Sequence, residues 1–147
     1  MTLRIAALAV LVLATPAAAQ SGTDSSAIRA AALDYAEGWY EGSMERMARA
    51  VHPELVKRIV ISDTATGRSV LQTMGASMLV NATGHGYGRK TPRERQDKDV
   101  RILDLYGDAA VVRVGMADWI DYLQVARLDG RWQIVNVLWE RKPGHGQ

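Results

Sequence analysis

The chain has 147 residues, a length typical of one globular domain, and its net charge of +2 is the small difference between 18 basic and 16 acidic side chains. The basic residues are spread along the whole chain, so nucleic acid is not expected as a partner. Cysteine is absent from the sequence, which excludes disulfides and thiol chemistry and leaves packing to stabilise the domain.

The N-terminus has the layout of an export signal. Arg4 precedes the apolar run Ile5 to Ala14, and the small residues Ala17 to Ala19 follow it. The run is shorter than the roughly 20 apolar residues that a transmembrane helix needs. We therefore expect residues 1–19 to be a cleavable signal peptide, the mature protein to be periplasmic or secreted, and no membrane span to remain after processing.

Three helices are expected in the first half of the mature chain. After a polar leader at 20–24, capping side chains precede a helix that ends near Gly42, with Ile28, Ala32, Tyr35 and Trp39 at helical spacing. Ser43 is expected to cap a short second helix, which Pro53 ends after His52. A third short helix is predicted over Gly75 to Thr83.

Strand patterns lie between and after these helices. A hairpin is predicted from Leu55–Ile61 to Ser69–Leu71, and the glycine-rich stretch Gly84 to Gly88 and the charged residues Arg89 to Arg101 are expected to be a loop and a solvated linker. Four further strands with short turns are predicted over Val100–Leu105, Ala109–Ala117, Trp119–Leu128 and Arg131–Glu140. The order predicts one α+β domain over 25–141, with helices on one face of an antiparallel sheet and a flexible tail at 142–147.

The last strands are apolar on both of their faces. If the final strand alternates regularly, Trp132, Ile134 and Leu138 share one face, and Val135, Val137 and Trp139 share the other. An antiparallel sheet with one solvated face should alternate apolar with polar residues. Since the helices can cover only one face, we expect a second copy of the chain to cover the outer face, which makes the protein a homodimer.

These residues carry a family resemblance. The segments Asp121-Tyr122-Leu123-Gln124-Val125 and Asp129 to Trp139, together with Trp39 to Gly42 and His52-Pro53, resemble the Putative lumazine-binding family of the nuclear transport factor 2-like (SnoaL-like) superfamily. The resemblance implies a cone, in which a strongly curved antiparallel sheet surrounds a hydrophobic cavity closed by about three N-terminal helices on its concave face. It also implies that dimers often form through the sheet. The superfamily includes enzymes, such as ketosteroid isomerase and scytalone dehydratase, and many noncatalytic binding modules, so the fold alone does not choose between them.

The cone predicts a pocket between the helices and the curved sheet. We expect a small apolar or aromatic ligand there. Tyr35, Trp39 and Met78 supply apolar helix stripes that suit either a core or a flat ligand, and Asn136 is a polar exception that either a ligand or Gln124 could satisfy. The expected pocket residues are Tyr35, Trp39, His52, Met78, Tyr122, Trp132 and Asn136.

Catalysis has weaker support in the sequence. The candidate catalytic residues are His52 as a base, Tyr122 as a hydroxyl donor and Asp121 as a carboxylate. Asp118 and Asp121 are three residues apart and would point to opposite faces of a strand, so they do not form an acid–base pair, and no acid shares the face of Tyr122. Asp121 is more simply explained as the anchor of a loop or an arginine. The three histidines lack the spacing of a metal site, and no metal or cofactor is expected.

Three functions remain open at this point. The favoured one is an exported, dimeric module that binds a small ligand. The second is an isomerase or dehydratase-like enzyme acting in the same pocket. The third is a noncatalytic assembly domain whose cavity is filled by its own side chains.

Overall fold

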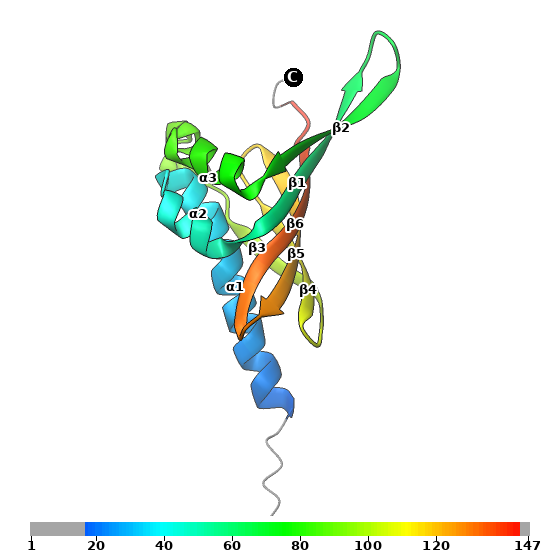
Figure 1. The fold of residues 1–147 in the computed structure, drawn as a ribbon. Coiled ribbons are helices and arrows are strands. Elements are labelled where there is room, and N and C mark those ends of the chain that lie inside the picture. Colours follow the sequence, from blue (N-terminus) through cyan, green and yellow to red (C-terminus); the bar gives the residue numbers. More distant parts are fainter. Residues whose placement is uncertain (1–16, 145–147) are drawn as a thin grey trace, which may run out of the picture.

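Three helices lie against one face of a single six-stranded sheet in the computed structural model, which describes residues 17–144 and their side chains from Gly22 onward (Figure 1). The helices are α1 (Ala17–Glu41), α2 (Met44–Ala50) and α3 (Ala76–Gly84), and two short 3-10 turns follow at Tyr87–Lys90 (η1) and Arg93–Arg95 (η2). The α+β class and the curved sheet with helices on its concave side are as predicted.

The sheet contains strands from both halves of the chain. Its order is β2-β1-β6-β5-β4-β3, and every neighbouring pair is antiparallel except β1 and β6, which run parallel. The parallel pair joins the N-terminal hairpin to the C-terminal strands, and the sequence pattern did not indicate it. The strands are β1 (Val51–Asp63), β2 (Arg68–Gly75), β3 (Asp99–Tyr106), β4 (Ala109–Gly115), β5 (Trp119–Leu128) and β6 (Arg131–Arg141).

Helix α1 starts earlier than its capping pattern predicted. It is continuous from Ala17, so the expected leader at 20–24 and the expected cap around Ser25 both lie inside it. Asp24 does not cap this helix, because its carboxylate accepts hydrogen bonds from Arg127 and from the indole of Trp132. The expected cleavage point before Gln20 falls in the first turns of α1, and residues 1–16 lie outside the described part of the chain.

The second helix begins and ends close to the predicted residues. The Ser43 hydroxyl accepts a hydrogen bond from the backbone N–H of Arg46, the arrangement expected of an N-cap. The helix ends at Ala50, and the chain passes directly into β1, so His52 belongs to the strand and not to the last turn of a helix. The predicted hairpin, the third helix and the four C-terminal strands are all present.

A β-bulge in β6 corrects the predicted faces of the last strand. Gln124 of β5 pairs with Asn136 while Val125 pairs with Ile134, so Val135 is an extra residue on β6. The bulge reverses the alternation after it, which places Trp132, Ile134, Val137 and Trp139 on the concave face. Leu138 and Asn136 therefore lie on the outer face, and the prediction that Leu138 shares a face with Ile134 is wrong.

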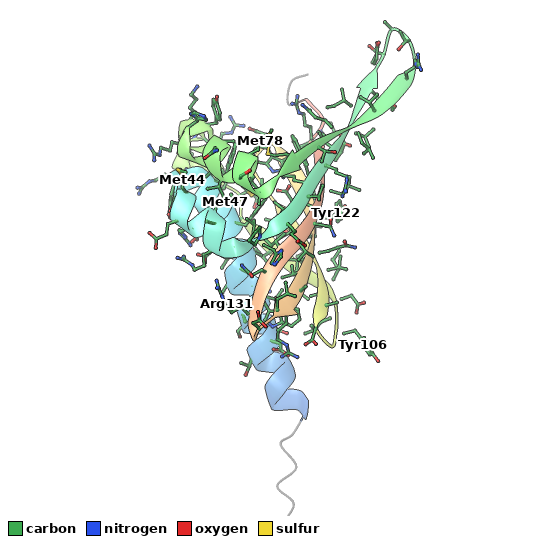
Figure 2. All side chains as sticks on the ribbon, viewed as in Figure 1. Met44, Met47, Met78, Tyr106, Tyr122 and Arg131 are labelled. Carbon is green, nitrogen blue, oxygen red and sulfur yellow. The ribbon has the colours of Figure 1, made fainter. Side chains whose placement is uncertain are left out.

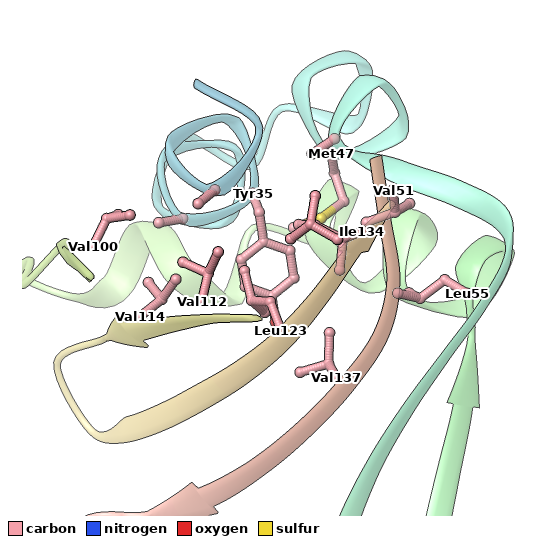
Figure 3. Packing of buried hydrophobic residues seen from close by; sticks show 14 of the residues in the cluster. Tyr35, Met47, Val51, Leu55, Val100, Val112, Val114, Leu123, Ile134 and Val137 are labelled. Carbon is pink, nitrogen blue, oxygen red and sulfur yellow. The ribbon is translucent and has the colours of Figure 1, made fainter. Parts of the chain in front are cut away.

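The concave face of the sheet and the helices enclose one apolar core. In Figure 3, Tyr35 extends from α1 and Met47 from α2 into the same cluster as Leu123, Ile134 and Val137 of the sheet. At the far end of the sheet, the hairpin of β1 and β2 extends past the helices (Figure 1). Its residues Val60, Ile61, Val70 and Leu71 are exposed.

Candidate functional site

A cavity of about 200 Å³ lies between the helices and the concave face of the sheet. Its wall is almost entirely apolar, and it draws on all three helices and on both the N-terminal hairpin and the C-terminal strands. This volume is below the roughly 300–1,000 Å³ of sites that hold drug-sized molecules, so it suits a ligand of one or two fused rings. The lining residues are Tyr35, Trp39, Met47, Lys57, Met74, Leu79, Ala82, Met116, Trp119 and Trp139.

Three indole rings form one side of the cavity. Trp39 and Trp119 meet edge to face with their centroids 5.8 Å apart, and Trp119 meets Trp139 in the same way at 5.9 Å. Rings in such contacts hold each other's orientation, and rigid, flat walls are well suited to a planar ligand. Three methionines complete the wall, and their flexible thioethers can adapt to the outline of a ligand.

Gly88 allows the chain after α3 to pack closely against Trp39. A side chain at Gly88 would collide with both the carbonyl oxygen and the indole ring of Trp39. The glycine-rich stretch after α3 is therefore more than the predicted loop, because Gly88 allows η1 to pack directly against α1 at the cavity wall.

A buried ion pair lies beside the aromatic wall. Lys57 of β1 and Asp121 of β5 are almost inaccessible to solvent, and Lys57 Nζ lies 2.5 Å from Asp121 Oδ1. The Tyr35 hydroxyl donates to the same carboxylate oxygen at 3.1 Å, and Trp119 Nε1 donates to Asp121 Oδ2 at 2.8 Å. Both oxygens of Asp121 are thus engaged by groups that border the cavity.

The ammonium of Lys57 has a mixed polar and aromatic environment. It donates to the Tyr35 oxygen at 2.6 Å, and it lies 5.3 Å from the centroid of the Tyr35 ring and 4.9 Å from that of Trp139. Burial lowers the pKa of Lys57, and the charge of Asp121 partly offsets that effect. Burial, and then the negative charge of Asp121, raise the pKa of Tyr35 well above its ordinary value, so the phenol stays neutral.

Two of the seven predicted pocket residues, Tyr35 and Trp39, line the cavity. Met78 is 57% exposed on α3, away from the cavity, and Tyr122 is 45% exposed on the side of the sheet opposite the helices (Figure 2). Met78 was placed in the pocket from an apolar helix stripe and Tyr122 from its strand face and its hydroxyl, and neither pattern reveals which side of an element faces inward.

The other three predicted pocket residues also lie elsewhere. His52 is half-buried on β1 outside the cavity lining, and its Nδ1 accepts a hydrogen bond from the backbone N–H of Glu54. Trp132 is buried on the concave face outside the cavity, where its indole donates to Asp24 and stacks under Arg127. The bulge turns Asn136 outward, where its amide donates to Gln124, the partner considered from the sequence.

Of the three candidate catalytic residues, only Asp121 lies beside the cavity, and its partner is Lys57 where a loop or an arginine was expected. Lys57 itself was missed, although the sequence held a signal for it. Leu55, Lys57 and Ile59 alternate on one face of a strand, and a lysine between two apolar residues on a buried face must be paired. Trp119 and Asp121, two residues apart on β5, were the matching pair.

Metal binding has no support in the part of the chain that the structure describes. Between residues 17 and 144, no group of three or more histidine and carboxylate side chains is placed to hold a metal ion.

Within the same range, no helix is long and apolar enough to cross a membrane.

Comparison with known proteins agrees with this architecture. The model of the family described as Putative lumazine-binding matches residues 23–140, which is most of the sequence. The chain belongs to this family. No curated protein sequence matches it significantly.

Solved structures similar to this member of the Putative lumazine-binding family share its fold at low sequence identity. An NTF2-like protein of unknown function from Shewanella baltica is 17% identical, with a TM-score of 0.65 over 84% of this chain and 97% of that one. A second NTF2-like protein of unknown function, from Silicibacter pomeroyi, is 16% identical, with a TM-score of 0.62 over 83% and 98% of the two chains. A ketosteroid isomerase-like protein from Erwinia carotovora is 14% identical, with a TM-score of 0.52 over 79% and 94%.

Proposed function

We propose that the protein is an exported binding module that holds a small, flat, largely apolar molecule in the cavity between its helices and its sheet. The observation that carries the proposal is the cavity itself, a hollow of about 200 Å³ walled by three tryptophans and three methionines. Protein interiors are normally packed to crystal density, and an apolar hollow of this size leaves dispersion contacts unmade. A ligand that fills it recovers those contacts. Membership of a family described as Putative lumazine-binding supports the same class of function.

Binding is favoured over catalysis by the state of the polar groups. A carboxylate that acts as a base needs a free oxygen toward the substrate, yet both oxygens of Asp121 accept hydrogen bonds from protein groups. His52 and Tyr122, the other candidates, lie outside the cavity lining. An isomerase or dehydratase-like reaction would have to displace the Lys57–Asp121 pair first.

The decisive experiment is native mass spectrometry of protein exported to the periplasm of a bacterial host. We expect a copurified molecule, together with a mature N-terminus at Gln20. The variant Ala82→Met fills the cavity from α3, and it should lose the molecule while the fold is kept. Ala27→Met adds the same side chain to the exposed surface of α1 and is the matched control.

Two outcomes would contradict the proposal. If the wild type carries no molecule and binds none of a panel of aromatic compounds, the cavity is not a binding site. If Ala82→Met retains the molecule as well as Ala27→Met does, the molecule binds somewhere else. Retention of the unprocessed chain in the host cytoplasm would refute export alone.

The outer face of the sheet favours a second copy of the chain as a partner. Tyr122 of β5 and Leu138 of β6 are directly opposite each other in the register, and both are about half exposed. A dimer through this face would bury them both. Light scattering should give a dimer mass for the wild type at micromolar concentration and a monomer mass for Leu138→Lys, with Leu128→Lys as the control at the end of β5. A monomeric wild type would refute it.

A further inference from the structure

The cavity proposed to hold the ligand is apolar on nearly every side, and Lys57 is the one charged residue in its lining. Lys57 borders the cavity, and its ammonium lies between the rings of Tyr35 and Trp139, which are both lining residues. The chemistry of this group therefore limits which apolar molecule the cavity can select. The inference below rests on the proposed binding function.

Among residues 17–144, every hydrogen-bond donor of Lys57, Tyr35 and Trp119 at the ion pair has an acceptor except one N–H of Lys57. Among residues 17–144, the ammonium, which carries three N–H donors, has two hydrogen-bond acceptors, Asp121 Oδ1 and the Tyr35 oxygen. The Tyr35 proton is committed to Asp121, and the Trp119 N–H is committed to the other carboxylate oxygen. The third N–H of Lys57 has no acceptor among these residues, so it is the donor that remains for a ligand.

The charge balance decides what kind of acceptor fits. Asp121 already neutralises the charge of Lys57 at 2.5 Å, so the pair as a whole is neutral. A ligand carboxylate would put a second negative charge beside Asp121 against an almost entirely apolar wall, at a large desolvation cost. A neutral carbonyl oxygen carries only a dipole and can accept the third N–H bond without that cost.

We propose that Lys57 selects ligands in which a flat apolar ring system carries one neutral carbonyl group, and that the carbonyl oxygen accepts a hydrogen bond from its ammonium. Asp121 and Tyr35 act as positioning residues, because they accept the other two hydrogen bonds of the ammonium and so fix its place at the wall. The three tryptophans bind the ring system, and the single N–H sets which edge of it faces β1.

Three probes of the same ring system and nearly the same size test this. Acetylnaphthalene carries the carbonyl, ethylnaphthalene replaces it with hydrocarbon, and naphthoate replaces it with a carboxylate, all at the same ring position. Equilibrium dialysis at neutral pH gives the Kd of each. A hydrogen bond from a charged donor is worth about tenfold or more in affinity, so we expect the ketone to bind at least about tenfold tighter than the hydrocarbon. Naphthoate should bind more weakly than the ketone.

The double variant Lys57→Met with Asp121→Asn removes both charges and leaves the ring wall intact. It should bind ketone and hydrocarbon equally well, while wild-type affinity for the hydrocarbon is largely kept. A second readout needs no variant: the infrared carbonyl stretch of the ketone bound to wild-type protein should lie at lower frequency than in hexane. This readout applies even if the double variant does not fold.

The outcomes separate this inference from the proposed function. If ethylnaphthalene binds but the ketone has no advantage, if naphthoate binds most tightly, or if the bound carbonyl stretch matches that in hexane, the role of Lys57 is refuted and the binding function stands. A ketone preference that persists in the double variant also refutes it. If none of the three probes binds, the role of Lys57 is refuted, and the native mass spectrum decides the binding function.

Discussion

The two ends of the concave face share β5 and β6 but are built from different kinds of side chain. At one end, aliphatic residues from β4, β5 and β6 interlock with small residues of α1, and Val112, Leu123 and Ile134 are completely buried. At the other end, indoles, methionines and one paired lysine surround a hollow of about 200 Å³. Branched aliphatic chains fill the space between two layers, whereas large rings that brace each other edge to face leave space they cannot enter.

The difference shows how one small domain can be stable and still hold a cavity. The filled end supplies most of the packing, so the hollow end does not have to. At the hollow end the walls are held by specific polar contacts instead, chiefly the Lys57–Asp121 pair with Tyr35 and Trp119. Three predictions test this division, and they run from the largest expected effect to the smallest.

The first prediction concerns the Lys57–Asp121 pair, whose polar contacts hold the walls of the hollow end. Asp121→Asn leaves the ammonium of Lys57 buried without its counter-charge, which should reduce the free energy of unfolding by about 3–5 kcal/mol. Urea denaturation measures the change. Asp118→Asn, in the turn before β5, affects an exposed ion pair with Arg95 and should cost less than about 1 kcal/mol. If both variants lose the same small amount, the pair does not frame the cavity.

The second compares truncations at the two ends. Leu123→Ala opens a new void in the filled end and should cost about 3 kcal/mol. Met74→Ala removes a half-buried wall of a cavity that already exists, so it should cost only about 1 kcal/mol, mainly from lost apolar burial. The same denaturation experiment measures both. Equal losses would show that the hollow end is packed as tightly in solution as the filled end.

The sequence predicted those features of this architecture that depend on local pattern. Helix stripes, the Ser43 cap, the hairpin turns and the strand spacing all report on neighbours within a few residues, and they gave the correct element order and class. The start of α1 was the local error, because the helix continues to Ala17 and the Asp24 carboxylate is engaged by Arg127 of β5 and Trp132 of β6.

The site depends on a β-bulge and on the pairing of strands that are far apart in the sequence, and local patterns of residues indicate neither. One extra residue, Val135, reverses the faces of β6 and moves Asn136 and Leu138 outward while it brings Trp139 inward. The parallel pairing of β1 with β6 places Lys57 within reach of β5, and nothing near Lys57 in the sequence announces that pairing. Even so, the position of Lys57 between Leu55 and Ile59 on one strand face indicated that it needs a buried acidic partner. Asp121, two residues after Trp119 on another strand, was a candidate for that partner.

The third and smallest predicted effect concerns the ion pairs that attach α2 to α1 at the hollow end. Arg46 of α2 binds Asp34, Glu37 and Glu41 of α1, while the next residue, Met47, lines the cavity. These groups are partly exposed, so solvent screens them, and Arg46→Met should cost about 1 kcal/mol at neutral pH. Arg93→Met, on the exposed turn η2, is the control and should have no measurable effect.

The pH dependence distinguishes this ionic attachment from simple loss of packing. A hydrogen bond from Arg49, and a second from Arg46, hold the pKa of Asp34 below its ordinary 3.8, and hydrogen bonds from Lys98 and Arg46 hold the pKa of Glu37 below its ordinary 4.5. Groups with lowered folded-state pKa values add stability above their unfolded values and lose it as the pH falls through the folded ones. The difference in unfolding free energy between wild type and Arg46→Met should therefore be constant above about pH 5 and shrink below pH 4. A difference that does not change with pH would mean that the Arg46 stem, and not its charge, attaches α2 over the cavity.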